Sequence, residues 1–387
     1  YAGADVGNYA ITDQATTTAD IAQKSLNIAA TAIDKTYDGT STATATLSTT
    51  DVLANDKVTL NQTAANFINA NQENDKNVGK GKTVRVTGLS LTGDDAANYL
   101  LTNGEETADT TASITAKSLS IAATASNKVY NANTAADVVL STSDMVTGDQ
   151  LTLNKTAANF DTKHVGVGKT VTVAGLNLGG ADAGNYAISN ANQQATATAN
   201  ITQAALTVSG IAAENKTYDG TTSATVSTSK AVLGGLFEGD ALSVTARGSF
   251  ADKTAATGKT VTLSSSYAGA DVGNYAITDQ ATTTATINKL AGVAVIANSQ
   301  SKTVGRADPV LTFSVTGLLA GDALSGSLAR APGEGAGLYD ITQGNLANEN
   351  YVISSYTPAQ LTISQPIADV AIANASRLPV IDMQPSV

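Results

Sequence analysis

Few residues in this chain have the types and spacing that catalysis or cofactor binding requires. Gly168-Lys169-Thr170 resembles part of a phosphate-binding loop, but the glycine required five positions earlier is Lys163, and strand-like residues follow. His164 is the only histidine and the chain has no cysteine. A histidine relay, a thiol nucleophile and a His/Cys zinc site are therefore all excluded within the chain. The sequence predicts no catalytic residue, no cofactor and no enzyme.

Acidic residues offer a second possible chemistry, the binding of calcium. Asp94-Asp95, Asp182 and Asp271 each stand shortly before an Asn-Tyr pair. They could bind Ca²⁺ where two modules meet, but no Asp-x-Asp-x-Asp-Gly loop is present. We favour turn capping by Asp and Asn instead and predict no metal site. Calcium at module junctions stays open as the alternative.

A lysine and an asparagine could also condense into an isopeptide bond, which would suit a chain without cysteine. Lys35 and Asn98 are one conceivable pair. No glutamate recurs at a fixed place beside them to assist the reaction, so nothing in the sequence requires such a bond.

Composition limits both the size of the cores and the class of partner. Hydrophobic residues make up 42% of the 387 residues but aromatic residues only 4%, which favours several small cores over one large core. The formal net charge of -11 disfavours binding to nucleic acid or to an anionic membrane surface. No apolar run approaches the length that spans a bilayer, so we expect no membrane insertion.

The elements that position all these residues belong to an internal repeat. A Lys-x-Tyr tripeptide occurs three times, each copy is followed by Gly-Lys-Thr-Val, and an Asn-Tyr pair closes each repeat. The tripeptide tyrosines are Tyr37, Tyr130 and Tyr218; the pairs are Asn8-Tyr9, Asn98-Tyr99, Asn185-Tyr186, Asn274-Tyr275 and Asn350-Tyr351. Successive pairs are 90, 87, 89 and 76 residues apart, the length of small independent domains.

We therefore predict four modules and two flanking pieces. The first module spans residues 24–116, the second 117–203, the third 204–288 and the fourth 289–365. Residues 1–23 are interpreted as the end of a preceding module, and residues 366–387 as a tail or linker.

The repeated residues are best interpreted as structural positions. We expect Tyr37, Tyr130 and Tyr218 to be buried in the core of their own modules. In each closing pair, from Asn98-Tyr99 to Asn350-Tyr351, the asparagine should hold a turn and the tyrosine should enter the core with its hydroxyl at the rim.

Apolar residues alternate with Thr, Ser and Asn at a period of two, which predicts about seven short strands in each module. The alternation slips between Val86 and Leu89, at Gly88, and again between Val173 and Leu176. A slip at a glycine predicts a β-bulge. The predicted class is all-β, with tandem immunoglobulin-like β-sandwich modules in a linear array.

Three motifs carry a resemblance to a known family. The Lys-x-Tyr-Asp-Gly opening, the Gly-Lys-Thr-Val strand and the Gly-x-Asp-x-Gly-Asn-Tyr close resemble the YDG and MBG modules of filamentous-haemagglutinin-like, two-partner-secreted bacterial adhesins. The first three modules are similar to YDG modules, although the second has Asn131-Ala132 where Asp-Gly stands in the others. The fourth is closer to MBG modules. The resemblance implies an extracellular location on the surface of a Gram-negative bacterium.

The interpretation is a structural repeat stalk of a large surface adhesin, which extends a distal adhesive domain from the cell. Its expected partners are the neighbouring modules of the same protein; the receptor is unknown. The main alternative is the subunit of an extracellular filament, assembled by strand donation between chains. Binding of carbohydrate or ice lacks the exposed aromatic cluster or flat threonine ladder that it would need.

Residues 1–19 repeat residues 267–285 without a change, whereas the other repeats have diverged. The offset matches three modules, which indicates that a block of three was duplicated. A strand from elsewhere should then cover the edges of the incomplete piece, either from a longer array or from another molecule.

Overall fold

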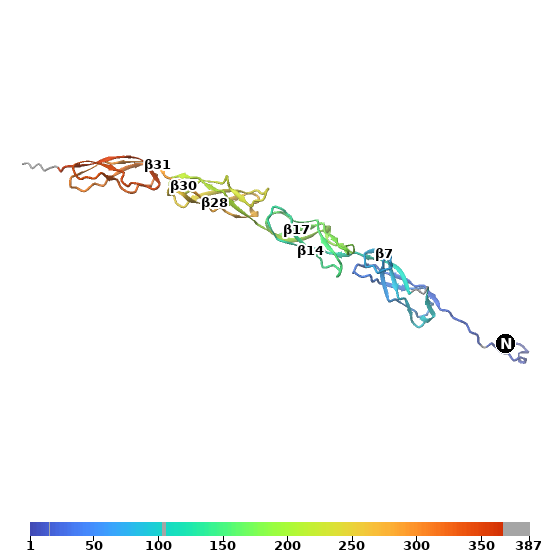
Figure 1. The fold of residues 1–387 in the computed structure, drawn as a ribbon. Helices are drawn as coiled ribbons and strands as arrows, with labels where there is room; N and C mark the ends of the chain where they lie inside the picture. The colour runs from blue at the N-terminus through green and yellow to red at the C-terminus, as the bar shows by residue number, and fades with distance from the viewer. Residues whose placement is uncertain (15, 103–105, 367–387) are drawn as a thin grey trace, which may run out of the picture. The chain divides into compact units, whose positions relative to one another are not determined.

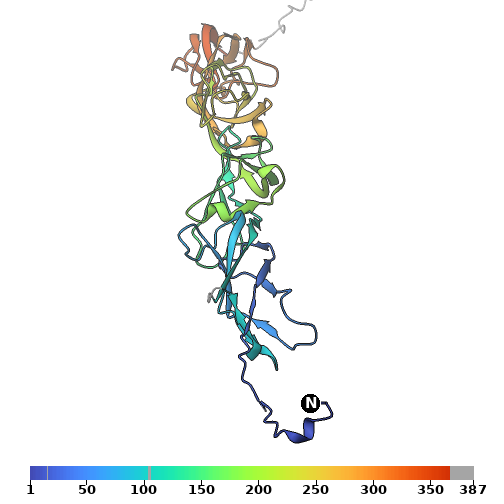
Figure 2. The ribbon, with the colours of Figure 1, turned by 90° about the vertical axis from the view of Figure 1, so that its right-hand side faces the viewer.

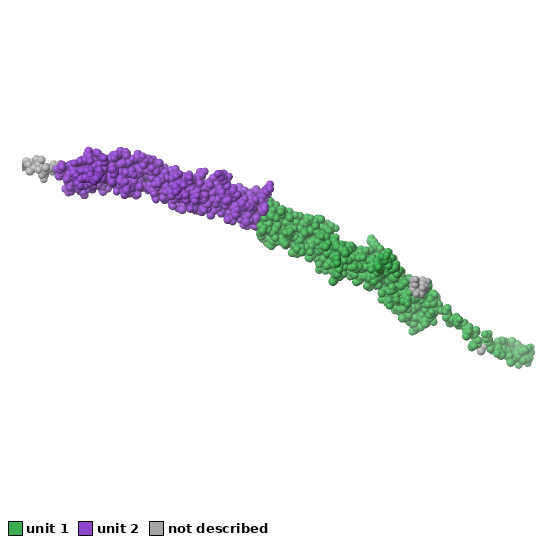
Figure 3. All heavy atoms as spheres, viewed as in Figure 1, with its two compact units in different colours: residues 1–202 green, residues 203–387 purple. Residues whose placement is uncertain are grey.

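The computed structural model describes residues 1–14, 16–102 and 106–366 and divides into two compact units, Tyr1–Thr202 and Gln203–Val387 (Figures 1 and 3). Within these described residues the regular elements are strands and short 3-10 turns. The predicted all-β class with tandem immunoglobulin-like β-sandwich modules is confirmed. No helix in the described part of the chain is long and apolar enough to cross a membrane.

The first module (residues 24–116) is built around a four-stranded sheet in the order β3-β10-β7-β6. Its strands are β1 (Lys24–Leu26), β2 (Ala29–Ala32), β3 (Lys35–Thr36), β4 (Ala45–Ser48), β5 (Thr59–Asn61), β6 (Ala64–Ile68), β7 (Gly79–Thr87), β8 (Ser90–Thr92), β9 (Tyr99–Leu101) and β10 (Thr107–Thr115). The pairs β1-β9, β2-β4 and β5-β8 form smaller sheets, and β2 contacts β10 across the sandwich.

The second module (residues 117–203) repeats this topology, with a main sheet in the order β13-β20-β17-β16. Its strands are β11 (Lys117–Leu119), β12 (Ala122–Ala125), β13 (Lys128–Val129), β14 (Val138–Ser141), β15 (Thr152–Asn154), β16 (Ala157–Phe160), β17 (Gly166–Ala174), β18 (Asn177–Gly179), β19 (Tyr186–Ile188) and β20 (Ala195–Thr202).

The third module (residues 204–288) has a five-stranded main sheet, β23-β30-β28-β27-β24, and a three-stranded sheet, β26-β21-β29. Its strands are β21 (Ala204–Ser209), β22 (Ala212–Ala213), β23 (Lys216–Thr217), β24 (Ser223–Ala224), β25 (Val226–Ser227), β26 (Val232–Gly234), β27 (Ser243–Phe250), β28 (Ala256–Ala268), β29 (Tyr275–Thr278) and β30 (Thr282–Asn288). In the described parts of these three modules there are thus ten strands each, of two to 13 residues, rather than about seven short ones.

The fourth module (residues 289–365) has sheets in the orders β32-β37-β35-β34 and β33-β31-β36. Its strands are β31 (Leu290–Ala297), β32 (Gln300–Thr303), β33 (Phe313–Thr316), β34 (Ala329–Arg330), β35 (Gly337–Thr342), β36 (Tyr351–Thr357) and β37 (Ala359–Ser364).

Each core is small because only one side of each strand is buried. In β7, Val84 and Val86 are fully buried while their neighbours Arg85 and Thr87 are not, as the period of two requires. Val171 and Val173 in β17 repeat the pattern. The same alternation in each module encloses a few aliphatic and aromatic side chains between the main sheet and the smaller sheets.

The β-bulge predicted at Gly88 is wrong. Ala64 pairs with Thr87 before the glycine and Asn61 pairs with Ser90 after it, in the same register, so no residue is inserted there. The chain instead leaves the main sheet at Gly88, whose φ of 66° is left-handed, and β8 pairs with β5 in a separate sheet. The register shift lies opposite Gly81, between Ala112 and Ile114.

Residues 1–23 contain one regular element among their described positions, a 3-10 turn at Val6–Asn8 (Figure 2). These described positions are exposed. Side chains that pack in the third module, such as Tyr275 (3% exposed), are therefore exposed in the first copy, where Tyr9 is 71% exposed.

Candidate functional site: the junctions between modules

The phosphate-loop resemblance does not correspond to a loop. Gly168, Lys169 and Thr170 lie inside β17, and Lys169 Nζ contacts Asp161 Oδ1 at 2.8 Å. His164 lies exposed between β16 and β17. Neither place has the geometry of an active site.

Tyr37 is buried, as the sequence predicts, with 1% of its surface exposed. However, it packs against the second module as well as against its own. Its hydroxyl donates to the carboxylate of Asp149 in the second module, at 3.1 and 2.9 Å from the two oxygens. Its ring packs edge-on against that of Tyr186, with centroids 5.5 Å apart and planes at 70°. The prediction of a core residue is corrected: Tyr37 lies at the junction between the two modules.

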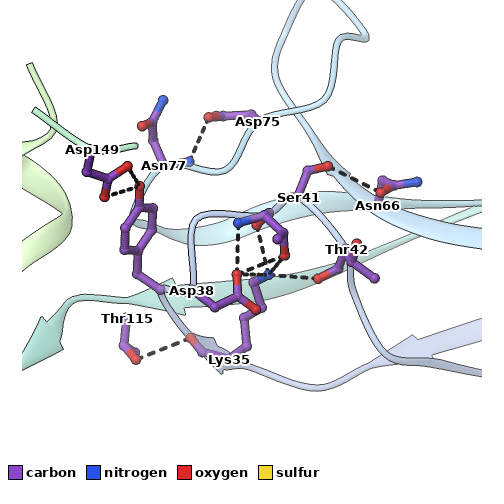
Figure 4. A network of polar contacts seen from close by, with 11 residues as sticks. Lys35, Asp38, Ser41, Thr42, Asn66, Asp75, Asn77, Thr115 and Asp149 are labelled. Carbon is purple, nitrogen blue, oxygen red and sulfur yellow. Dashed lines mark hydrogen bonds and ion pairs between the residues drawn. The ribbon is translucent and has the colours of Figure 1, made fainter. Parts of the chain in front are cut away.

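Asp149 is the centre of this junction, and its side chain is only 2% exposed. Besides Tyr37, it accepts a hydrogen bond from the hydroxyl of Tyr186 at 2.6 Å and one from Lys76 Nζ at 2.9 Å. Figure 4 shows Asp149 beside the opening loop of the first module. Three donors, two of them from the first module, thus satisfy one buried carboxylate.

A second contact fixes the orientation of the two modules. Asn185 Oδ1 accepts the backbone N–H of Val78 at 2.9 Å, and Asn185 Nδ2 donates to Asn77 Oδ1 at 3.1 Å. Asn185 stands at the end of the 3-10 turn Ala183–Asn185, directly before Tyr186. The Asn-Tyr pair therefore supplies both an amide and a phenol to the junction.

The charges at this junction support one another. Burial disfavours the charged form of Asp149, but the hydrogen bonds from Tyr186, Lys76 and Tyr37 outweigh it and hold the pKa below its usual value. The hydrogen bond to Asp149 raises the pKa of Lys76. Burial, together with Asp149, raises the pKa of Tyr186 to about 12. At neutral pH the junction therefore holds a carboxylate, an ammonium and two neutral phenols.

The third and fourth modules meet through the same groups. Asp322 accepts the hydroxyls of Tyr218 at 2.8 Å and Tyr351 at 2.6 Å, and Lys253 Nζ lies 3.6 Å from it. The two rings are 5.4 Å apart at 72°, and Asn350 Oδ1 accepts the backbone N–H of Ala255 at 2.8 Å. Each group has a counterpart at the first junction.

The lysine of each opening tripeptide has a separate, local function. Lys35 Nζ donates to Asp38 Oδ1 and the carbonyl oxygens of Thr40 and Thr42, at 2.8, 2.8 and 2.9 Å (Figure 4). It also lies 5.9 Å from the ring centre of Phe67. Lys216 makes the equivalent contacts with Asp219, Thr221, Ser223 and Phe250. The lysine closes the loop that presents the junction tyrosine.

The second module closes the same loop without a carboxylate. Lys128 Nζ donates to Asn131 Oδ1 at 2.9 Å, and burial lowers the pKa of Lys128. In the third module, by contrast, the hydrogen bond from Lys216 is the main cause that lowers the pKa of Asp219 to about 2. Ala132 also adopts a left-handed φ of 63°, where Gly39 and Gly220 have 82° and 76°.

The remaining repeated residues occupy equivalent places. Tyr130 is 1% exposed and Tyr218 2%; the closing tyrosines Tyr99, Tyr186, Tyr275 and Tyr351 are between 3% and 6% exposed. Each closing tyrosine donates to an aspartate of its own module, namely Asp56, Asp149, Asp240 and Asp322. Asn185 and Asn274 are buried, whereas Asn98 is exposed.

Sequence reasoning missed the groups that complete the junction. Gly148-Asp149 has the composition of an ordinary turn, and Lys76 belongs to none of the three repeated motifs. A signal was present: an aspartate recurs in each module at Asp56 and in the Gly-Asp dipeptides that end at Asp149, Asp240 and Asp322. Because local turn propensity accounts for these dipeptides, the sequence alone does not indicate that the aspartate also contacts a neighbouring module.

The residues considered for calcium binding and for an isopeptide bond make other contacts in the structure. Asp182 forms an ion pair with Lys76 at 3.2 Å, and Asp95 accepts the backbone N–H of Lys57 at 2.9 Å. Lys35 donates to Asp38 and Thr40 in its own loop, so it is not placed for the isopeptide bond with Asn98 that the sequence left conceivable. Among the described residues no group of three or more His, Cys, Asp or Glu side chains could hold a metal ion.

Models of two known families together match most of the chain. The family model of the YDG domain matches residues 22–110, 115–197 and 202–285, and that of the MBG domain (YGX type) matches residues 293–362. The resemblance seen in the sequence is confirmed. No curated protein matches the chain.

Several solved structures are similar at low identity. The four domains EC1-4 of Drosophila N-cadherin are 10% identical over 89% of this chain and 98% of theirs, with a TM-score of 0.21. The four N-terminal Ig domains of Dscam1 isoform 9.44 are 8% identical over 89% and 98%, with a TM-score of 0.18. The I9-I11 tandem of titin is 12% identical over 67% and 98%, with a TM-score of 0.17.

Proposed function

Because the chain belongs to the family of YDG-domain proteins, with three YDG domains followed by one MBG domain, we propose that it is a stretch of the stalk of a bacterial surface adhesin. In this proposal the modules are spacers. They hold a distal adhesive domain away from the envelope of a Gram-negative cell, and they catalyse no reaction.

The observation that carries the proposal is the repetition of one contact network at two junctions. A stalk requires that each module be fixed to the next, and a buried carboxylate with three donors does this with directional, charge-assisted bonds. Asp149 and Asp322 occupy the same place at the two junctions. Use of one network at both places is what a modular spacer requires.

The use of the repeated residues also favours a scaffold over an enzyme. Tyr37 and Lys76 are engaged by Asp149, and Lys35 is engaged by its own loop. Groups already satisfied in this way are not available to bind or activate a substrate. The repeat thus uses its polar residues for cohesion.

Two measurements on the full chain test the spacer function. Sedimentation at several concentrations should show a monomer, and small-angle scattering should give a maximum dimension that grows by about 35–45 Å for each module, from strands rising about 3.3 Å per residue. A filament subunit assembled by strand donation would instead grow in mass with concentration. Concentration-dependent assembly would contradict the proposal.

Localisation needs a test on cells. Antibodies against the full chain should label intact cells of the source organism, and protease added outside should remove the label. Labelling that requires permeabilised cells would contradict a surface stalk.

A further inference from the structure

The first module carries a further copy of the surface that receives a neighbour at the two junctions. We name this surface, made by Asp56, Asn98 and Tyr99, the acceptor face. The hydroxyl of Tyr99 donates to Asp56 Oδ2 at 2.5 Å and accepts the backbone N–H of Leu53 at 3.0 Å. Asp95 accepts the backbone N–H of Lys57 at 2.9 Å. The acceptor face is therefore preformed.

The equivalent surface of the second module has the same geometry but is occupied. The hydroxyl of Tyr186 donates to Asp149 at 2.6 Å and accepts the backbone N–H of Val146 at 2.9 Å, and Asp182 accepts that of Gln150 at 2.9 Å. In the fourth module Tyr351 repeats these bonds with Asp322 and Leu319, at 2.6 and 3.0 Å. The copies in the second and fourth modules thus show directly what this arrangement binds.

Exposure of the asparagine distinguishes the acceptor face from its occupied copies. Asn98 is exposed, whereas Asn185 is 4% exposed beneath the first module. Asn350 at the second junction is half-buried, and Asp56 is half-buried like Asp322, whereas Asp149 is buried. The described positions among residues 1–23 are exposed, and Gln23 Nε2 donates to Ala97 O at 2.8 Å, beside Asn98 but not to its side chain. No donor to Asn98 Oδ1 is present within residues 1–14, 16–102 and 106–366.

We propose that the acceptor face binds the downstream end of another YDG module. The partner's opening tyrosine and the lysine before its Gly-Lys-Thr-Val strand would donate to Asp56, and a backbone N–H beside that lysine would donate to Asn98. This inference rests on the proposed function, because it applies the same junction chemistry to a further partner. The partner is defined by a phenol, an ammonium and one free backbone amide.

The fourth module of a second copy does not fit this description. Val304 occupies the place of the tyrosine: its N–H donates to Ser364 O at 2.9 Å, as that of Tyr37 donates to Thr115 O at 2.9 Å. The nearby loop carries Glu334, which is bound to Lys302 at 2.6 Å. Valine offers no hydroxyl, and a glutamate would repel Asp56. The junction chemistry is therefore directional and selects a YDG end.

The sequence identifies the kind of YDG module that fits. Residues 1–19 duplicate residues 267–285 of the third module and lead directly into the first module. The third module's own donors, Tyr218 and Lys253, are the ones that bind Asp322. A module of the third kind is thus the occupant that the chain itself specifies.

The test uses the full chain with residues 204–266 added before Tyr1, which completes residues 1–19 into a module of the third kind. The natural sequence has no cysteine, so Asn98→Cys gives a single thiol in the acceptor face. We expect this thiol to react about tenfold or more slowly in the extended chain than in the original chain, since charge-assisted bonds hold the docked state closed. The matched control is the extended chain with Tyr218→Phe and Lys253→Ala in the added copy only, where the thiol should react fast again.

A second measurement tests the docking without a substitution in the acceptor face. In the extended chain without substitutions, hydrogen exchange of a peptide covering residues 93–99 should slow to the level of residues 180–186. Equal resistance of the added module to limited proteolysis in both extended chains verifies that it is folded. Fast exchange of residues 93–99 and a fast thiol, with the added module folded, would overturn the inference.

The first junction separates this failure from failure of the proposed function. Asn185→Cys, in place of Asn98→Cys, should react slowly in every chain. If residues 180–186 are protected and residues 93–99 are not, only the inference fails. If neither peptide is protected, the modules are not coupled and the proposed function fails with it.

Discussion

The two junctions use the same groups but bury them to different degrees. At the first junction the side chain of Asp149 is 2% exposed, Lys76 lies 2.9 Å from it, and Asp182 is a second acceptor for Lys76 at 3.2 Å. At the second junction the side chain of Asp322 is 15% exposed and Lys253 lies 3.6 Å away. The tyrosine pair has nearly the same geometry at both, with centroids 5.5 and 5.4 Å apart.

The difference shows which part of the network defines a junction and which part adjusts its strength. The two phenols and the aspartate set the geometry, since they recur unchanged at both places. Burial and the position of the lysine vary, and both change the electrostatic strength of the contact. We therefore expect the first junction to be the stronger one.

The largest effect should come from neutralising the central carboxylate. Asp149→Asn should weaken docking of the first and second modules by about 1.5–3 kcal/mol, because charge-assisted hydrogen bonds become neutral ones. Hydrogen exchange of the Val78 amide, whose acceptor is Asn185 Oδ1, reports the opening of this junction.

The matched control is Asp322→Asn at the second junction. It should accelerate exchange of the Ala255 amide, whose acceptor is Asn350 Oδ1, by a smaller factor and leave the Val78 amide unchanged. Equal effects at the two junctions would mean that burial does not set their strength.

Acid should open the first junction at the pH set by its carboxylate. The pKa of Asp149 in the docked state lies below its usual value, so the charged carboxylate stabilises docking above about pH 4. That contribution is lost as the pH falls through the docked pKa. The pKa of Tyr186 is raised to about 12, so its neutral hydroxyl stabilises the junction below about pH 10. This contribution to docking is lost as the pH rises from about 10 to 12.

Exchange of the Val78 amide from pH 7 down to pH 3, corrected for its intrinsic pH dependence, measures the acid limb. Asp149→Asn should remove that limb. A limb that persists in this variant would assign the pH dependence to another group.

A smaller effect is expected in the opening loops that present the junction tyrosines. Ala132 has a left-handed φ of 63°, so Ala132→Gly should stabilise the second module by about 0.5–1 kcal/mol. Gly39→Ala should act in the opposite direction, since Gly39 has a φ of 82° and an added Cβ would lie 2.7 Å from Cγ1 of Val146. Urea unfolding, followed by hydrogen exchange of peptides from each module, measures both changes. An unchanged stability of the second module in Ala132→Gly would mean that Ala132 is not strained.

The sequence predicted what depends on local pattern. Period-two alternation gave the strands, and the recurrence of Tyr37 and the Asn-Tyr pairs gave the repeat. The pattern also showed a break at Gly88. It could not distinguish an inserted residue from a chain that leaves one sheet for another, because both interrupt the alternation on one face.

What the sequence could not predict is which group covers a buried residue. Periodicity indicates that Tyr37 is buried, but its acceptor, Asp149, is 112 residues away in the next module. Asp149 follows Gly148, and that dipeptide is explained fully by a turn. Contacts between modules join residues whose local patterns are each complete, so no local signal remains to connect them.

The central claim, that Tyr37 and Asp149 couple two modules, is tested most directly by a double-mutant cycle. Tyr37→Phe, Asp149→Ala and the double variant are compared through the opening free energy of the Val78 amide. We predict a coupling energy of about 1–2 kcal/mol, as for a phenol bonded to a buried carboxylate. The control cycle of Tyr37→Phe with Asp322→Ala should be additive. Additivity within about 0.3–0.5 kcal/mol in the first cycle as well would contradict the account.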